Sequence, residues 1–287
     1  MRLLPFTVVI TILSFSFCAQ KEAPTVSTPI TNTPTTPAVP TTPVVVDTTK
    51  KLVWSDEFDS GTRPDTSKWA YNIGTGSNGW GNNEAQYYTS DSTNARIENG
   101  NLIIEARKES KGGKSYTSAR LLTQGKKAWT YGRFEIRAKL PKGIGSWPAI
   151  WMLGSNISTA GWPLCGEIDI MEHVGSEQDV INFSTHSKLL NWTLGTQRTY
   201  KTTVDNVSTG FHVYKMEWTK DWIQFFVDDK LYYTSNNDGR GRDSYPFVDD
   251  QFLLLNLAVG GNMGGTKGID DAIFPIKMEV DYVRVYQ

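Results

Sequence analysis

The sequence predicts an all-β protein built as a sandwich of two antiparallel sheets, and two observations lead to this prediction. Apolar and polar residues alternate with a period of two in several short segments, which is the pattern of strands with one buried face. No stretch of helical length places apolar side chains at helical spacing without glycine, proline or strand alternation intervening. Two stacked sheets would bury such strands, and one sheet can curve into a groove.

The clearest strand is expected at residues 133–140, where every second residue from Phe134 to Leu140 is apolar and charged residues lie between them. A second alternating segment includes Tyr214, Met216 and Trp218. It is followed by a turn near 219–221, a further strand over 222–227 and another turn at 228–229. This order is typical of consecutive β-hairpins.

The amino-acid composition indicates which kinds of molecule the protein binds. The 287 residues include ten tryptophans, twelve tyrosines and twelve phenylalanines, and the formal net charge is −1. Such a charge gives no electrostatic preference for nucleic acid or for an anionic membrane surface. Abundant aromatic rings either pack in the core or form flat binding platforms. A neutral substrate is therefore favoured over a charged one.

The N-terminal region predicts export. Residues 1–18 have the layout of a signal peptide, with Arg2 before an apolar run that is too short to span a bilayer. Cys18 ends this run and resembles the lipidated cysteine of a bacterial lipoprotein, although Phe17 also leaves room for ordinary cleavage and release. Residues 19–50 are rich in Thr and Pro and are expected to form an extended spacer. The protein is thus expected to be secreted or to be a surface or outer-membrane lipoprotein.

A single domain is expected over residues 51–287. Its one cysteine, Cys165, is predicted to be a buried thiol, because Cys18 would be acylated or removed and no disulfide partner would remain. Nothing in the sequence indicates an oligomer, so a monomer is expected.

The segment 166–174 places three carboxylates, Glu167, Asp169 and Glu172, within six residues. In a regular strand Glu172 would point away from the other two. A β-bulge around Ile170 and Met171 shifts the register by one residue and brings all three acids to one face. A calcium site or an exposed acidic strand is the alternative, but the apolar residues between the acids disfavour a solvated strand.

Four effective strand steps place the Cα atoms of the two glutamates about 13 Å apart. Side chains that lean together would bring the carboxyl groups within about 5–7 Å. Retaining glycosidases hold their two carboxyls about 5–5.5 Å apart and inverting enzymes about 6.5–9.5 Å. The spacing leans toward retention without deciding it. Asp169 lies between the glutamates and is expected to push their pKa values apart, which leaves one ionised and one protonated.

These residues, with motifs along nearly the whole domain, resemble glycoside hydrolase family 16 and, within it, the bacterial laminarinases, which are endo-β-1,3-glucanases. The resemblance implies a β-jelly roll with a substrate cleft on its concave face. The segments that carry it are WSDEF at 54–58, NNEAQYY at 82–88, YGRFE at 131–135, WPAIWMLG at 147–154, GWP at 161–163, the acidic strand, NLAVGG at 256–261 and VDYVRVY at 280–286.

The resemblance also implies catalytic roles. Glu167 would be the nucleophile, Asp169 the assisting acid and Glu172 the general acid/base of a double displacement that retains anomeric configuration. No cofactor is required for this chemistry. The extra Met171 indicates the bulged branch of the family, which also contains agarases and carrageenases.

Further residues are placed in the cleft by the same resemblance. Tryptophan faces suit the axial C–H bonds of β-glucose, and polar side chains hydrogen-bond to sugar hydroxyls. For the tryptophans the alternative is core packing. His186 is expected near Glu172, with a framework histidine as the alternative. The set expected to bind substrate is Trp147, Trp151, Trp162, Asn82, Glu84, Arg120, His186 and Asn256.

One structural calcium ion is implied by resemblance, held away from the cleft by Glu57, the carbonyl of Gly100 and Asp281. Oxygen ligands of this kind suit a hard cation. Salt-bridged carboxylates at strand ends are the alternative. The sequence departs from many laminarinases at Met263, where they have a tryptophan. Loss of that platform would favour mixed-linked or substituted glucans.

Three functions compete with a β-1,3-glucanase. The same domain could cut mixed-linked β-1,3-1,4-glucan or a red-algal galactan, although sulfated galactans would require basic residues around the cleft. A non-catalytic glucan-binding lectin would be expected to have lost an acid, and all three are present. A transglycosylase passes through the same glycosyl-enzyme, so the sequence does not separate it from a hydrolase.

Overall fold

The computed structural model describes residues 49–287. The predicted signal peptide, Cys18 and nearly all of the predicted spacer lie outside the described residues. Within the described part no helix is long and apolar enough to cross a membrane. The regular secondary structure of the described residues is mostly antiparallel β-sheet, as the alternating sequence pattern predicts.

One sheet has eight strands. Its order is β15-β14-β13-β8-β17-β5-β4, with β1 paired to β17. Every pairing in it is antiparallel. Its strands are β1 (Leu52–Asp56), β4 (Ala95–Glu98), β5 (Asn101–Ala106), β8 (Gly132–Lys139), β13 (His212–Trp218), β14 (Trp222–Val227), β15 (Lys230–Asn236) and β17 (Ile276–Tyr286).

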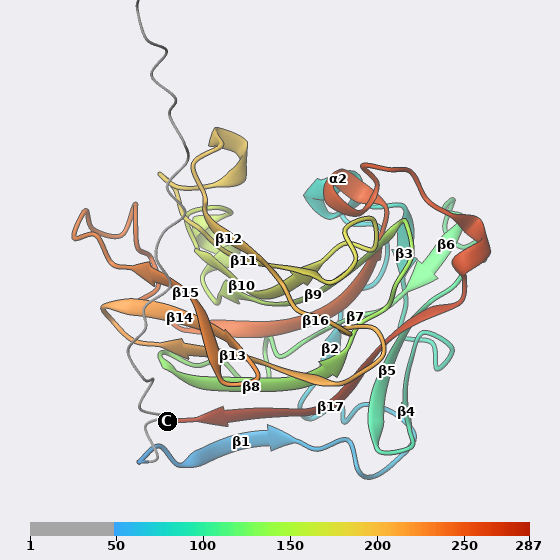
Figure 1. Cartoon of the computed structure of the whole chain (residues 1–287), viewed down its shortest axis with the longest axis horizontal. Helices are drawn as coiled ribbons and strands as arrows, with labels where there is room; N and C mark the ends of the chain where they lie inside the picture. Colours follow the sequence, from blue (N-terminus) through green and yellow to red (C-terminus); the bar gives the residue numbers. More distant parts are fainter. Residues whose placement is uncertain (1–48) are drawn as a thin grey trace, which may run out of the picture. The chain divides into compact units, whose positions relative to one another are not determined.

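The second sheet has seven strands in the order β12-β11-β10-β9-β16-β7-β2. Figure 1 shows it curving above the eight-stranded sheet, with loops rising on either side of its outer face. Its strands are β2 (Ala70–Tyr71), β7 (Arg120–Leu122), β9 (Ser146–Gly154), β10 (Glu167–His173), β11 (Val180–His186), β12 (Arg198–Thr203) and β16 (Gln251–Val259).

Short elements complete the domain. Strands β3 (Gln86–Tyr88) and β6 (Tyr116–Ser118) form a small parallel pair. The helical turns are η1 (Gly79–Asn83), α1 (Ile157–Ala160), η2 (Trp192–Leu194), α2 (Gly261–Gly264) and η3 (Asp271–Ile273).

The hydrophobic core lies between the two large sheets and follows from the period-two pattern. In β8 the alternate residues Phe134, Ile136 and Ala138 are fully buried. In β13 the alternate residues Tyr214 and Trp218 belong to the same core cluster. The hairpins β13–β14 and β14–β15 confirm the predicted meander.

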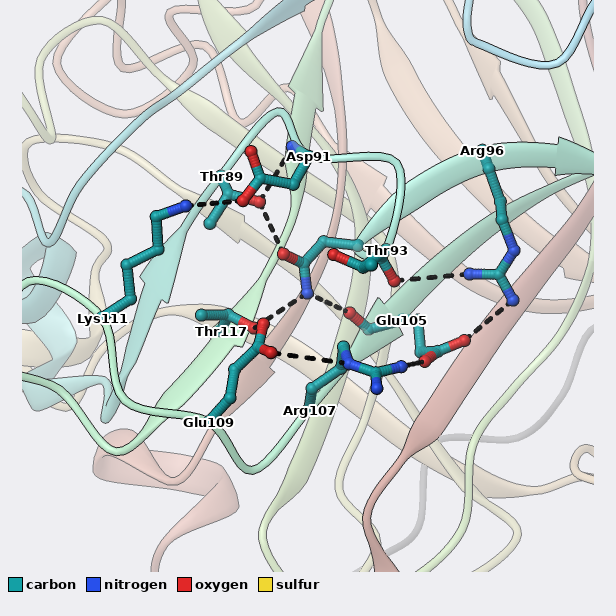
Figure 2. Close-up of polar contacts among 10 residues, drawn as sticks. Thr89, Asp91, Thr93, Arg96, Glu105, Arg107, Glu109, Lys111 and Thr117 are labelled. Atoms are coloured by element: carbon teal, nitrogen blue, oxygen red, sulfur yellow. Dashed lines mark hydrogen bonds and ion pairs between the residues drawn. The ribbon is translucent and has the colours of Figure 1, made fainter.

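A polar network joins the small β3–β6 pair to the edge of the eight-stranded sheet (Figure 2). Its centre is the buried Asn94, whose amide donates to the carbonyl of Glu105 and to Thr117 Oγ1, at 3.0 Å each. The side chain of Asn94 also accepts a hydrogen bond from Thr89. Because buried polar groups are costly unless paired, this satisfied network fixes the segment before β4 in one conformation.

Candidate active site

The catalytic candidates lie on β10, an interior strand of the seven-stranded sheet between β11 and β9. Its pairing with β9 shifts between Asp169 and Met171, and its pairing with β11 shifts between Asp169 and Glu172. This is a β-bulge at the expected place. Ile170 and Met171 are both fully buried, so two consecutive side chains face the core. Glu172 is thereby returned to the same face as Glu167 and Asp169.

The side chains of these three acids line a cleft of about 800 Å³ on the outer face of the curved sheet. All eight residues expected to bind substrate also line this cleft. Most of them come from strands on either side of β10, so the concave sheet collects residues that are far apart in the sequence. They are Asn82, Glu84, Arg120, Trp147, Trp151, Trp162, His186 and Asn256.

Two tryptophans hold the glutamates by hydrogen bonds. The indole N–H of Trp162 donates to Glu167 Oε2 at 3.1 Å. The indole N–H of Trp147 donates to Glu172 Oε1 at 3.0 Å. Both rings were expected to stack on sugar, with core packing as the alternative. The structure adds a second role, because each donor fixes one carboxylate and favours its ionised form.

His186 faces the other end of the acidic strand from the one expected. Its Nε2 lies 3.2 Å from Asp169 Oδ2 and 3.6 Å from Glu167 Oε1. The charge of His186 also lowers the pKa of Glu172, but the direct contacts of its ring are with Asp169 and Glu167. Because β11 runs antiparallel to β10, its last residue, His186, pairs with Glu167, while Asn182 pairs with Glu172.

Burial raises the pKa of each of the three acids. It raises the pKa of Glu167 to about 8, with a further contribution from the charge of Asp169. It raises the pKa of Asp169 and of Glu172 to about 8 as well. Because the three shifts have the same direction, burial alone does not separate the pKa values of Glu167 and Glu172, as one ionised and one protonated acid require. Electrostatic coupling must do so, because ionisation of one carboxyl raises the pKa of its neighbours.

Arg120 is held between two aromatic rings at one side of the cleft. Its guanidinium carbon lies 4.8 Å from the ring centroid of Trp80 and 4.7 Å from that of Trp151. Glu84 is buried nearby, where burial raises its pKa and the charge of Arg120 opposes that shift. The planar cation is thus fixed by stacking and presents its N–H groups in a defined direction.

Asn256 on β16 ties this side of the cleft together. Its Oδ1 accepts a 2.7 Å hydrogen bond from the indole N–H of Trp151, and its Nδ2 donates to the hydroxyl of Tyr88 at 3.1 Å. Asn82 lies in η1 and is partly exposed at the rim. These groups are positioned for hydrogen bonds with a polar ligand.

Sequence analysis missed several residues that line the cleft. Those on β11 and β12 could have been found, because Asn182 and Ser184 precede His186 at alternate positions, and Thr199 alternates with Lys201 in the same way. Trp80 and Trp192 lie in the short helical turns η1 and η2, where no repeating sequence pattern indicates which way a side chain points. The lining residues that were not predicted include Trp80, Asn182, Ser184, Trp192, Gln197, Thr199 and Lys201.

The three residues expected to hold calcium lie on the eight-stranded sheet, away from the cleft. The carboxylate of Glu57 accepts hydrogen bonds from Arg284, including one of 2.7 Å. Asp281 is paired with Arg137. Gly100 lies in the β4–β5 turn with a positive φ of 73°. Both carboxylates are thus engaged by arginine, which is the alternative of salt-bridged acids.

Cys165 is the free, buried thiol that the sequence predicted. It is 1% exposed and belongs to a small apolar cluster with Leu153 and Phe252. Burial raises the pKa of the thiol to about 11. A thiol with this pKa is protonated at neutral pH and is therefore a packing residue and not a nucleophile.

Comparison with known proteins agrees with this geometry. The sequence profile described as glycosyl hydrolases family 16 matches residues 82–284. A β-glucanase from Rhodothermus marinus is 52% identical over 246 residues, which is 83% of this chain and 85% of the relative. The X-ray structure of the laminarinase from Rhodothermus marinus has a TM-score of 0.81 at 52% identity, covering 83% of this chain and 97% of that one.

A second solved structure is similar to the same extent. It is a mutant of SCLam, a non-specific endo-β-1,3(4)-glucanase, which presents 1,3-β-D-cellobiosyl-glucose at its active site. The TM-score is 0.82 at 47% identity, with 86% of this chain and 98% of that chain covered. The segment matched by the family profile, residues 82–284, includes the bulged acidic strand and all but one strand of the curved sheet. The chain therefore belongs to glycoside hydrolase family 16.

Proposed function

We propose that the protein is an endo-acting hydrolase of β-1,3-glucan that retains anomeric configuration. The observation that carries this proposal is the bulged strand β10, which directs Glu167, Asp169 and Glu172 into one open cleft. An open cleft accepts the interior of a polysaccharide chain. The laminarinase from Rhodothermus marinus, with 52% identity, supports the choice of glucan.

The reaction follows from the position of the two glutamates. Glu167 attacks the anomeric carbon while Glu172 gives its proton to the departing glycosidic oxygen. A covalent glycosyl-enzyme results, and the shortened chain leaves. Glu172, now ionised, takes a proton from water, which attacks the same carbon and frees Glu167. Two inversions at one carbon retain its configuration.

The surrounding groups support these roles. Nε2 of His186 lies 3.6 Å from Glu167 Oε1, and the indole N–H of Trp162 hydrogen-bonds to the other oxygen. Both favour the ionised carboxylate that a nucleophile requires. Asp169 is 3% exposed and lies between the glutamates. Burial, and then the charge of Asp169, raises the pKa of Glu172, which favours the protonated acid before the first step.

The charges along the cleft favour a neutral substrate. Apart from His186, its cationic lining residues are Arg120 and Lys201, and Lys201 is paired with Glu177 at 2.9 Å. Four acids line the same cleft, among them Glu84. A sulfated galactan would be repelled by this surface. A β-glucan carries no charge and is not repelled.

Mixed-linked β-1,3-1,4-glucan is the second candidate, and Met263 favours it. This side chain lines the cleft and packs against the apolar cluster of Trp147, Val174 and Ala258. A flexible thioether fits several ring orientations, whereas a flat indole would select one. We therefore expect some activity on mixed-linked glucan.

Product release from four polysaccharides tests the proposal. The purified protein and its Glu167→Gln variant are incubated with laminarin, lichenan, agarose and carrageenan. Short oligosaccharides should appear from laminarin, β-anomers should form first in the NMR spectrum, and the variant should be inactive. Cleavage only of a galactan would overturn the substrate assignment. Binding of laminarin without cleavage would indicate a lectin.

A structural calcium ion at Glu57, Gly100 and Asp281 is a separate proposal. Binding would require Arg284 and Arg137 to release the two carboxylates. The loss of these two ion pairs would offset part of the free energy gained by binding calcium. If the ion binds, removing it with a chelator should lower Tm, and Asp281→Asn should abolish that effect. A Tm that is insensitive to both calcium and chelator would leave the salt bridges as the only role of these acids.

Export and surface attachment are proposed from residues 1–50. Residues 1–18 act as a lipoprotein-type signal, Cys18 carries the lipid, and the spacer holds the domain, expected as a monomer, away from the surface. Labelled fatty acid should enter the wild-type protein in a bacterial host and be absent from Cys18→Ser. Release of unlabelled wild-type protein into the medium would instead indicate ordinary signal cleavage.

A further inference from the structure

Trp192 is an exposed indole at one end of the cleft. It begins the helical turn η2 between β11 and β12 and lines the cleft. Its exposure is 45%, and of the ten tryptophans it alone is exposed. A large ring kept in contact with water forgoes the stabilisation that burial gives. An exposed tryptophan facing a binding cleft therefore indicates a contact that a ligand completes.

The position of Trp192 relative to Glu167 is defined by Trp162. The ring centroids of Trp162 and Trp192 are 6.2 Å apart, with planes tilted by 39°. The N–H of Trp162 reaches Glu167 at 3.1 Å. Trp192 is thus one aromatic ring further from the nucleophile. It lies on the β11–β12 side of β10, opposite the side on which β7 carries Arg120.

The loop that carries Trp192 is fixed before any ligand binds. Asn191 is 2% exposed, and its Oδ1 accepts hydrogen bonds from the backbone N–H and the hydroxyl of Thr193, at 3.1 and 2.6 Å. Its Nδ2 donates to the carbonyls of Ser187 and Lys188. An aromatic ring on a fixed loop binds a ligand with little loss of conformational entropy.

We infer that Trp192 is a sugar-binding platform that stacks on a pyranose ring beyond the ring held at Trp162. Gln197 and Thr199 line the cleft close by in the chain and supply hydrogen bonds to the hydroxyls of that ring. The inference rests on the proposed glucan hydrolysis. It adds that the β11–β12 end of the cleft selects for substrate length, because only a chain long enough to reach Trp192 gains the contact.

Substrates of increasing length test this inference. The kcat/KM of wild-type protein, Trp192→Ala and Trp192→Phe is measured on a series of β-1,3-gluco-oligosaccharides and on laminarin. The ratio of kcat/KM on laminarin to that on the shortest cleaved oligosaccharide should fall about tenfold in Trp192→Ala, mainly through KM. Trp192→Phe retains a flat ring and should restore most of the ratio.

Leu194 provides the matched control. It lies in the same turn, is 60% exposed and is not part of the cleft lining. Leu194→Ala should leave the length dependence unchanged. A direct binding measurement with the Glu167→Gln protein gives an independent readout, since Trp192→Ala in that background should weaken laminarin binding by the same factor.

Two results would overturn the inference while the proposed function stands. One is an equal loss of kcat/KM at every substrate length. The other is a lower Tm with unchanged length dependence, which would make Trp192 a cover over Trp162 and nothing more. If wild-type protein neither cleaves nor binds laminarin, the proposed function fails first and the inference fails with it.

Discussion

The hydrogen bond from Trp162 to Glu167 should control the pH at which the enzyme becomes active. In Trp162→Phe the aromatic ring remains and the 3.1 Å bond is lost. A hydrogen bond to a charged group contributes about 1.5–3 kcal/mol, and one pKa unit corresponds to about 1.36 kcal/mol. The bond favours ionised Glu167, whose side chain is 17% exposed, so its loss should raise the pKa of that carboxyl by about one to two units.

The pH profile of kcat/KM on laminarin measures this shift. A nucleophile must be ionised, so activity rises as pH passes the lower apparent pKa of the coupled acids. In Trp162→Phe that acidic limb should move up by about one to two pH units, with most activity recovered at higher pH. Trp151→Phe is the control, because Trp151 donates to the neutral Asn256 and should move neither limb.

Trp147→Phe should shift the opposite limb. Its indole N–H donates to Glu172, the acid that must be protonated at the start. Loss of this donor raises the pKa of Glu172 and extends activity to higher pH. An unchanged acidic limb in Trp162→Phe, despite lower activity, would refute the assignment of Trp162 as the group that holds the nucleophile ionised.

Three further predictions concern the fold around the acids. Deletion of Met171 removes the bulge and leaves a regular alternation in which Glu172 stays on the face of Glu167 and Asp169, so the protein should keep measurable activity on laminarin and an unchanged circular dichroism spectrum. A folded but inactive deletion variant would show that the bulge itself sets the distance between the carboxyl groups. Burial, then the charge of Asp169, raises the pKa of Glu172 to about 8 from an ordinary value of 4.5, so the native state loses stability as pH rises through this interval. The Tm of Glu172→Gln should therefore exceed that of the wild type by a few degrees at pH 8 and equal it at pH 4.5. Equal Tm values for the two proteins at both pH values would contradict this. Phe183→Ala removes a fully buried ring stacked 5.5 Å from Phe225 and should cost about 3–5 kcal/mol in urea unfolding, and a loss below about 1 kcal/mol would mean that the core repacks.

The sandwich and the acidic strand could be predicted because their signals are local. Alternation at Phe134 and Ile136 depends only on the two-residue period of a strand. The bulge at Met171 was predictable because Glu172 follows Glu167 by five residues. An odd spacing puts two side chains on opposite faces of a regular strand, and a bulge returns them to one face. Strand period and the need for clustered acids were together sufficient.

The contacts between strands could not be predicted in the same way. The bond from Trp151 to Asn256 joins residues 105 positions apart, so it depends on which strands become neighbours. The pairing of His186 with Glu167 depends on the antiparallel register of β10 and β11, which the alternation within either strand does not determine. Likewise, the guanidinium of Arg284 that engages Glu57 comes from the far end of the chain.

The closing strand pair has a practical consequence for redesign. Lys51 and Gln287 exchange two backbone hydrogen bonds, of 2.8 and 3.0 Å, where β1 lies against β17. Both belong to the sheet that does not carry the cleft (Figure 1). Adjacent ends suit circular permutation. A short linker could join residue 287 to residue 51, with new termini opened in the exposed turn at Gly112 and Gly113, so that a fusion partner could be attached at another point of the molecule.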